Sequence, residues 1–187
     1  MTTKKEGSEF DRIKRNDEFI TKIRNKVKKG EMFQLDPSII RELENYLIFS
    51  RRYETGNERR IPSGSGGEKD LLEVASLLEE NQSYKDRVVK ISINLYSRLN
   101  RLTRIRKTAE AYIYKTYSEY MDLLRSESIR RTIIEDILDV VFDKEDEFKT
   151  AVKICEMVLQ NLSSTHFVLS GVKDILMLVF SNKEREV

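Results

Sequence analysis

Few residues in this chain have the side chains that catalysis usually requires. The 187 residues include one His and one Cys. His166 lies in the segment SSTHF, with Cys155 and Asp174 nearby in the sequence. A Ser-His-Asp mechanism also needs a marked nucleophile and an oxyanion hole, and the sequence has no nucleophile-elbow motif. We therefore predict no enzymatic activity and no catalytic residue. His166 is expected to be helix-terminal or partly exposed, and Cys155 to be a small buried thiol.

Carboxylates gather in one short stretch of the C-terminal half. A two-metal site needs acidic residues that converge on one point from separate elements. These residues instead follow one another through a single predicted turn and helix start. We expect a solvated acidic surface that binds neither metal nor cofactor, with contact to a basic partner as the alternative. The residues are Asp136, Asp139, Asp143, Glu145, Asp146 and Glu147.

The segment 53–69, YETGNERRIPSGSGGEK, holds four of the seven glycines and one of the two prolines. GSGGEKD invites comparison with a phosphate-binding loop. The Walker pattern, however, needs Gly-Lys-Ser/Thr between a strand and a helix. Here Glu68 separates Gly from Lys, and Asp70 replaces the hydroxyl. The segment is therefore predicted to be a flexible linker loop.

Basic residues and tyrosines follow one another from 98 to 120. Basic residues interleaved with aromatic residues can hold single-stranded nucleic acid. Arg and Tyr also dominate protein interfaces, and a solvated face paired with nearby acids is the third interpretation. The net charge of only +2 argues against a protein that coats nucleic acid. The predicted partner-binding residues are Arg98, Arg101, Arg104, Lys107, Tyr112, Tyr117 and Tyr120.

A long helix over 87–124 must position this row. The segment RVVKISINLYSRLNRLTRIRKTAEAYIYKTYSEYMDLL has neither Gly nor Pro. Its apolar residues recur at steps of three and four, which places them on one side of a helix. At 1.5 Å per residue the helix would be about 55 Å long. Its apolar stripe is longer than the other helices cover, so pairing with a second copy or a related subunit is expected.

The other segments predict further helices around this one. LDPS at 35–38 makes Asp36 an N-cap and Pro37 the first helical residue, and the helix should end near Arg51 or Arg52. An earlier helix is expected over 10–27. The predicted fold is an all-α helical bundle around one long central helix. Its predicted parts are N-terminal helices at 1–52, the linker at 53–69, the main bundle at 70–162 and a tail at 163–187.

Several boundaries within the bundle are also predicted. Asn81-Gln82-Ser83 marks a break before the central helix, and Ser128 caps the helix that follows it. Asp143 caps the last long helix, with Asp146 as a competing cap. In the tail, helix is favoured over a strand formed by the run ILMLVF.

The composition of the chain also bears on where in the cell the protein is expected. No run of about 18 apolar residues occurs, so no membrane span is predicted. The first residues, MTTKKEGSEFDR, lack a hydrophobic leader. One cysteine excludes an intrachain disulfide. A cytoplasmic protein is expected. The dense charge, 35% of residues, is typical of the solvent-facing sides of long helices.

The second half of the predicted central helix resembles the core helix of GINS replication-complex subunits, of the archaeal type in which the helical domain comes first. The similar segment is Arg101–Arg125, RLTRIRKTAEAYIYKTYSEYMDLLR. The family's acid-started helix is similar to DKEDEFKTAVKICEMVL (Asp143–Leu159). Its early helix and variable loop are similar to FQLDPSIIRELENYL and to residues 53–69. The similarity spans about 33–162.

The resemblance implies a non-enzymatic subunit that braces the replicative MCM helicase at the DNA replication fork. Its partners would be other subunits of the same complex and the MCM helicase, in the cytoplasm at the nucleoid. The family's β domain would come last, but after Leu162 only about 25 residues remain, too few for several strands. The alternatives are a nucleic-acid-binding helical protein that uses the basic row, or a scaffold of another complex.

Overall fold

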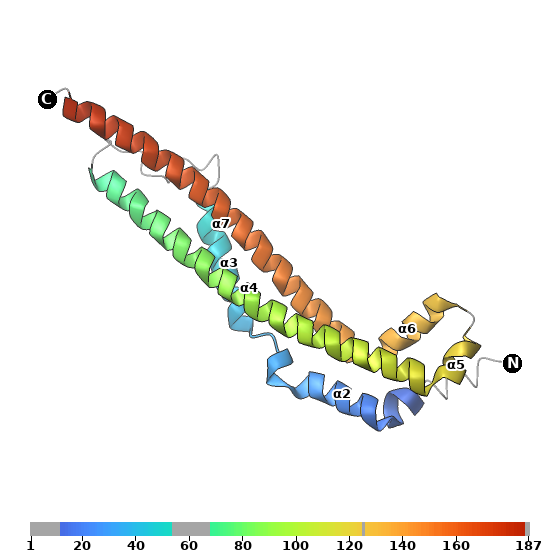
Figure 1. Cartoon of the computed structure of the whole chain (residues 1–187). Helices are drawn as coiled ribbons and strands as arrows, with labels where there is room; N and C mark the ends of the chain where they lie inside the picture. The colour runs from blue at the N-terminus through green and yellow to red at the C-terminus, as the bar shows by residue number, and fades with distance from the viewer. Residues whose placement is uncertain (1–11, 54–67, 125, 186–187) are drawn as a thin grey trace. The chain divides into compact units, whose positions relative to one another are not determined.

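The structure is a computed structural model that describes residues 12–53, 68–124 and 126–185. All regular structure in these ranges is helical, so the predicted all-α fold with one long central helix is confirmed (Figure 1). Residues 12–16 form a first helical turn. The elements that follow are α2 (Glu18–Lys29), η1 (Glu31–Phe33), α3 (Pro37–Arg51), α4 (Glu68–Thr116), α5 (Ser118–Leu123), α6 (Glu127–Ile137) and α7 (Asp139–Arg185).

The central helix α4 begins earlier and ends earlier than its apolar pattern predicts. The predicted break at Asn81–Ser83 is wrong, because α4 continues through it without interruption. Asn81 is fully buried, and its amide nitrogen donates to the carbonyl of Leu162 in α7 at 3.0 Å. α4 ends at Thr116, and Tyr117 leaves the helical conformation before α5. The polar residue that suggested a cap is therefore a contact between two helices.

The last helix, α7, is a single element from Asp139 to Arg185. The predicted N-caps at Asp143 and Asp146 are wrong, since both lie inside the helix. Asp139 stands at its start, where its carboxylate accepts from the Val140 N–H at 2.6 Å. The tail is helical through Arg185, as favoured, and joins the preceding helix without a break.

The N-terminal half matches its cap signals closely. Asp36 accepts from the Ser38 N–H at 2.8 Å, Pro37 opens α3, and α3 ends at Arg51, as predicted. The helix expected over 10–27 is interrupted at Asp17, which caps α2 by accepting from Ile20 N–H at 2.9 Å.

Two other predictions concern later parts of the chain. The predicted N-cap at Ser128 is wrong, because α6 begins at Glu127. The predicted linker lies mostly outside the described residues.

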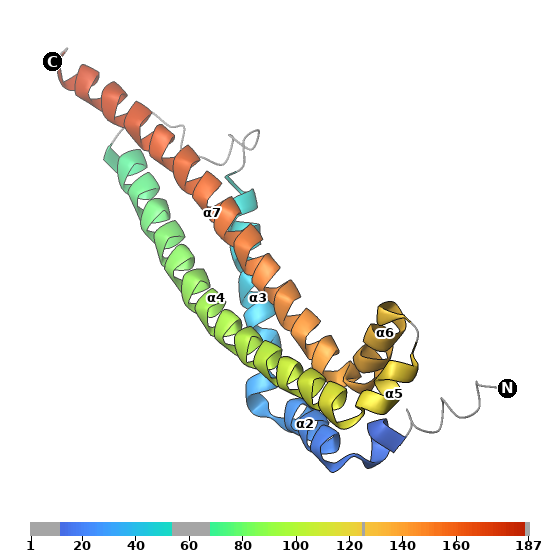
Figure 2. The same ribbon diagram turned by 45° about the vertical axis from the view of Figure 1, so that its right-hand side comes forward.

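The chain divides into two compact units. One takes the chain up to Leu35 together with Leu95–Thr150, and the other takes Asp36–Asn94 and the chain from Ala151 onward. In the second unit, α7 runs antiparallel to α4, and α3 packs against both (Figures 1 and 2). The core of the first unit includes Ile13, Ile20, Val27, Phe33, Leu102, Ala109, Ile113, Ile137 and Phe148. The core of the second includes Leu43, Phe49, Val74, Val88, Cys155, Val158, Leu162 and Leu169.

Buried polar side chains link the three helices of the second unit. Thr165 is 2% exposed and donates to the carbonyl of Ser50 at 3.3 Å. Asn81 reaches α7 through its amide nitrogen, while its Oδ1 is buried and has no protein partner among the described residues. Since the amide must lie opposite the Leu162 carbonyl, Asn81 fixes the register of α4 against α7, as a single buried Asn does in coiled coils.

Replacing Asn81 by Leu is expected to raise the free energy of unfolding by about 1 kcal/mol. A buried polar atom without a partner costs about 1–3 kcal/mol, and leucine removes that cost at similar volume. Urea unfolding followed by circular dichroism measures the change. The matched control is Gln82→Leu at the exposed neighbouring position, which should change stability by no more than about 0.5 kcal/mol. A loss of stability in Asn81→Leu would contradict this assignment.

Candidate functional site

Four exposed cations lie on one side of α4. We call Arg101, Arg104, Lys107 and Lys115 the basic face. Their positions fall within about a third of a turn of one another around the helix. None of the four forms an ion pair in the described part of the chain. The only carboxylate between Arg101 and Lys115 is Glu110, which pairs with Arg106 at 2.7 Å instead.

The basic face contains three of the predicted partner-binding residues and one that the prediction missed. Lys115 was missed because the row was traced only by steps of three, and Lys115 returns to the same face two turns after Lys107. Arg98, the first residue of the predicted row, is partly buried and donates to the Gln34 carbonyl at 3.2 Å. Arg98 therefore helps to hold the chain that follows η1.

The predicted tyrosine contacts have partners within the chain. The hydroxyls of Tyr112 and Tyr117 both donate to Asp17 Oδ2, at 3.0 Å and 2.5 Å. The Tyr112 ring also lies 4.3 Å from the Phe19 ring, measured between centroids. Tyr120 is partly buried in α5. Tyr112 and Tyr117 thus fasten the start of α2 to the end of α4, while on the basic face Arg101 donates to Met32 Sδ at 3.9 Å.

The hydrogen bonds between Asp17, Tyr112 and Tyr117 shift the pKa values of all three residues. Burial would raise the pKa of Asp17, but the hydroxyls of Tyr117 and Tyr112 and the Ile20 N–H stabilise the carboxylate, and the net result is a lowered pKa. Burial and the Asp17 carboxylate raise the pKa of Tyr117 well above its usual range, and that of Tyr112 also rises. Asp17 is therefore ionised, and both tyrosines are neutral donors, at neutral pH.

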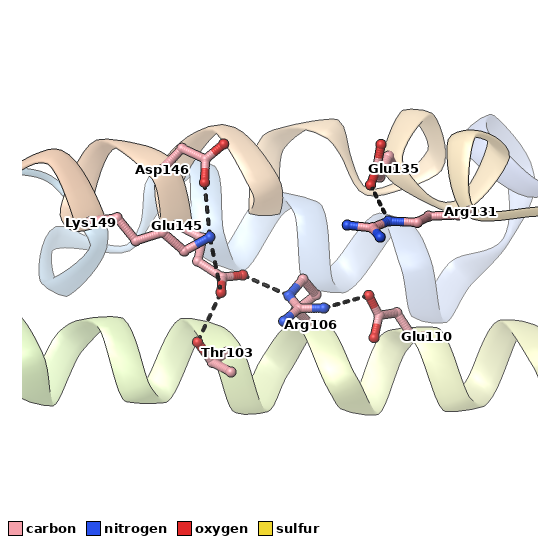
Figure 3. Close-up of polar contacts among 8 residues, drawn as sticks. All are labelled: Thr103, Arg106, Glu110, Arg131, Glu135, Glu145, Asp146 and Lys149. Carbon is pink, nitrogen blue, oxygen red and sulfur yellow. Dashed lines mark hydrogen bonds and ion pairs between the residues drawn. The ribbon is translucent and has the colours of Figure 1, made fainter. Parts of the chain in front are cut away.

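On the opposite side of α4, Arg106 enters a buried polar cluster with Glu145 of α7 (Figure 3). The residue Glu145 is 3% exposed, so its predicted place in a solvated acidic surface is wrong. Its carboxylate accepts from Arg106 Nε at 2.7 Å and from the Thr103 hydroxyl at 3.0 Å. The Arg106 guanidinium carbon also lies 5.3 Å from the centroid of the Phe142 ring. This cluster joins α4 to α7 within the first unit.

Other carboxylates of the predicted acidic surface are paired with cations of the same unit. Asp136 contacts Lys14 at 3.0 Å, and Asp139 contacts Arg24 at 2.9 Å. Asp146 and Glu147 pair with Lys149 and Lys144, respectively. Within the described residues, no group of three or more His, Cys, Asp or Glu side chains is placed to hold a metal ion. Asp136 and Asp139 therefore attach the N-terminal helices, and Asp146 and Glu147 pair within α7. Among the described residues, none of these four acids pairs with the basic face.

His166 and Cys155 lie apart on α7. They are separated by three helical turns, or about 16 Å. Cys155 is fully buried, and burial followed by the charge of Glu156 raises the pKa of its thiol to about 11. His166 is partly buried in the middle of the helix rather than at its end, and its Nδ1 has no protein partner in the described chain. The two side chains do not form a shared site.

α7 is also a long and apolar helix. Over Asp139–Asn182 its length and composition are sufficient to cross a membrane. One such helix is weak evidence for a span, because the core helix of a water-soluble protein meets the same criterion. Part of this helix is packed within the second unit, including Val158, Leu162 and Leu169, while 22% of its most apolar 18-residue window is buried.

Comparison with known proteins gives no relative on which to base a function. No protein-family model, curated protein or solved structure matches this chain.

Proposed function

We propose that this protein is a non-enzymatic subunit of a multiprotein complex and that the basic face of α4 is its main contact surface. The observation that carries the proposal is the arrangement of Arg101, Arg104, Lys107 and Lys115. In a chain of net charge +2, four exposed cations share one side of a single helix, and none of them has a carboxylate partner within the residues that the structure describes. A fixed positive surface of this kind attracts and orients an acidic partner.

The partner is proposed from the resemblance of Arg101–Arg125 to the core helix of GINS subunits. It is the MCM helicase at the replication fork, together with other subunits of the same complex. The basic face lies within the segment that carries this resemblance. The protein would then act in the cytoplasm, at the nucleoid. It would have no turnover of its own and would brace the motor through a rigid helix.

A second candidate function is direct binding of nucleic acid by the same face. Besides its cations, α4 exposes Tyr114, which is 42% accessible, one residue before Lys115. A helix that presents cations and an aromatic ring can contact the phosphates of a single strand and stack on its bases. The uncompensated local charge favours this candidate more than the net charge of the whole chain suggested.

One pair of substitutions tests both candidates. Arg101→Glu with Arg104→Glu should abolish co-elution with purified MCM helicase if the protein partner is correct. If nucleic acid is the partner, the wild-type chain should bind a fluorescent single-stranded oligonucleotide in an anisotropy titration. The slope of log K against log salt should then fall by about 0.7 for each cation lost.

The matched control reverses two exposed cations outside the basic face, Arg41→Glu with Lys153→Glu. It makes the same change in net charge and should retain binding. Equal loss in both double variants would show that total charge, not the basic face, governs binding. Binding to neither ligand by the wild-type chain would contradict both candidates.

A further inference from the structure

Positive charge is concentrated on two neighbouring elements of the first unit. Residues 12–35, which include α2 and η1, contain eight Lys and Arg but only three Asp and Glu. The part of α4 that belongs to this unit, residues 95–116, contains six Lys and Arg and one Glu. Residues 126–150, in α6 and the start of α7, contain four Lys and Arg and eight Asp and Glu. The net charge of +2 therefore conceals a separation of charge within one unit.

The two positively charged elements lie side by side. α2 runs antiparallel to this part of α4 (Figures 1 and 2). At one end of the contact, the Phe19 ring of α2 packs on the Tyr112 ring of α4. At the other end, Met32 Sδ of η1 accepts from Arg101 at 3.9 Å. The contact between α2 and α4 therefore extends along the basic face.

The last turn of α2 is held in place by the turn that follows it. Gln34 joins the two helices, because its carbonyl accepts from Arg98 of α4 at 3.2 Å and its Nε2 donates to the Lys28 carbonyl at 2.8 Å. Gly30 makes this turn possible, since a Cβ there would lie 2.6 Å from the Lys26 carbonyl oxygen. The cations at the end of α2 are thus fixed next to the first cations of the basic face.

Three lysines and one phenylalanine share the side of α2 that meets α4. They recur at steps of three and four residues, which places them on one side of the helix. Phe19 is 36% exposed, and the lysines are exposed as well. Because Phe19 packs on Tyr112, this side of α2 borders the basic face. We call these residues the α2 row: Phe19, Lys22, Lys26 and Lys29.

The charges of the α2 row are largely available for contact. Lys22 pairs with Glu18 at 2.6 Å, whereas Lys26 and Lys29 have no ion-pair partner among the described residues. The helix dipole favours lysines in the last turn of any helix, so Lys26 and Lys29 alone indicate no ligand. The dipole does not account for the exposed arginines that lie beside them on α4. Two rows of cations therefore flank one line of contact between two helices.

We propose that the α2 row and the basic face together bind single-stranded nucleic acid. This inference rests on the proposed function, because it takes the basic face as a contact surface, and it adds a second helix and a class of partner. The cations of both helices contact the phosphates of the strand. Phe19 on one border of the surface and Tyr114 on the other expose rings on which bases can stack.

A single strand fits this surface better than an acidic protein or a duplex does. From Arg101 to Lys115 the basic face is about 21 Å long. A nucleic acid carries a negative charge at every nucleotide along such a length, whereas the surface of a folded protein usually mixes both signs. A duplex keeps its bases stacked on one another, so the exposed rings would have no base to contact. Charge and aromatic exposure together therefore favour the single strand.

Anisotropy titration of the full-length chain with a fluorescein-labelled oligothymidylate of about 20 nucleotides tests the inference. The wild-type chain should bind this strand with an affinity that falls as salt rises, and should bind the corresponding duplex more weakly. Lys26→Gln with Lys29→Gln should lower the affinity about 20-fold near 0.1 M salt and reduce the slope of log K against log salt by about 1.4. Phe19→Leu retains an apolar contact but removes the ring. It should lower the affinity at least about fivefold with an unchanged salt slope.

The matched control is Arg41→Gln with Lys153→Gln, which removes two exposed cations of the second unit and should bind the strand as the wild type does. Circular dichroism of each variant checks that its helix content is unchanged. Should Phe19→Leu unfold, the two lysine substitutions on the exposed side of α2 still test the inference.

The outcomes separate this inference from the proposed function. If Lys26→Gln with Lys29→Gln binds as the wild type does while Arg101→Glu with Arg104→Glu loses binding, α2 is not part of the site and this inference fails, although the second candidate function stands. Equal affinity for the duplex, or equal competition by polyglutamate, would overturn the choice of ligand. A wild-type chain that binds no oligonucleotide at about 100 μM in low salt would overturn the inference and leave the co-elution test with MCM helicase unaffected.

Discussion

Replacing Arg106 by Met is expected to lower the free energy of unfolding by about 3 kcal/mol. The guanidinium lies between Glu110 and Glu145, at 2.7 Å from each carboxylate. The Glu145 side chain is only 4% exposed, so its charge has little access to water. Removing one partner of a buried ion pair leaves the other charge uncompensated, which costs about 3–5 kcal/mol. Lys149, 3.7 Å from Glu145, and the Thr103 hydroxyl should keep the loss near the lower limit.

Urea unfolding followed by circular dichroism measures this loss. Arg104→Met, on the exposed side of the same helix, is the matched control and should change the free energy of unfolding by no more than about 0.5 kcal/mol. The double variant Arg106→Met with Glu145→Met should recover much of the stability, since two apolar side chains then replace both charges. If Arg106→Met alone costs less than about 1 kcal/mol, Glu145 is not the buried charge described above.

The second large effect is expected at Asp17, where replacement by Ala should cost about 2 kcal/mol at neutral pH. One carboxylate oxygen caps α2 through the Ile20 N–H, and the other accepts from Tyr112 and Tyr117. Loss of an N-cap costs about 1 kcal/mol, and hydrogen bonds to a charged acceptor add a similar amount. Thermal or urea unfolding of Asp17→Ala at pH 7 measures the sum.

The contribution of Asp17 should also depend on pH. Its pKa is lower in the folded chain than in the unfolded chain, so the unfolded state binds the proton more readily. The stabilisation is therefore complete above the unfolded pKa of about 4 and is lost as the pH falls through the lower folded pKa. The difference in stability between wild type and Asp17→Ala should shrink over that acidic range. Asp17→Asn, which retains a capping oxygen, should lose less at neutral pH, and a difference that stays constant down to pH 2 would contradict the assignment.

The parts of the fold that local chemistry determines were predictable from the sequence. Asp36 and Pro37 predict the start of α3 because a cap and a first-turn proline act within four residues. The three-and-four spacing of apolar residues likewise indicated the long helix α4. The predicted break at Asn81 was wrong. A polar residue that caps a helix and a polar residue that contacts a neighbouring helix look alike in the local sequence. Only the position of Leu162 distinguishes the two.

The candidate site, like the fold, has some residues whose placement the sequence predicts and others whose partners it does not reveal. Arg101, Arg104 and Lys107 were predicted together because helical spacing alone puts them on one face. The partners of Tyr112, Tyr117 and Glu145 come from residues 39 or more positions away, at Asp17 and Arg106, and no local pattern reveals such pairs. Whether the basic face binds a partner stays a prediction.

The burial of Cys155 makes the folded chain convenient for site-directed labelling. The thiol is inaccessible, and its pKa of about 11 leaves almost no thiolate at neutral pH. Thiol-reactive maleimide or nitroxide reagents should therefore not modify Cys155 while the chain is folded. They should react only with a cysteine introduced on the surface. Fluorophores or spin labels can then be placed on α4 or α7 in the wild-type background.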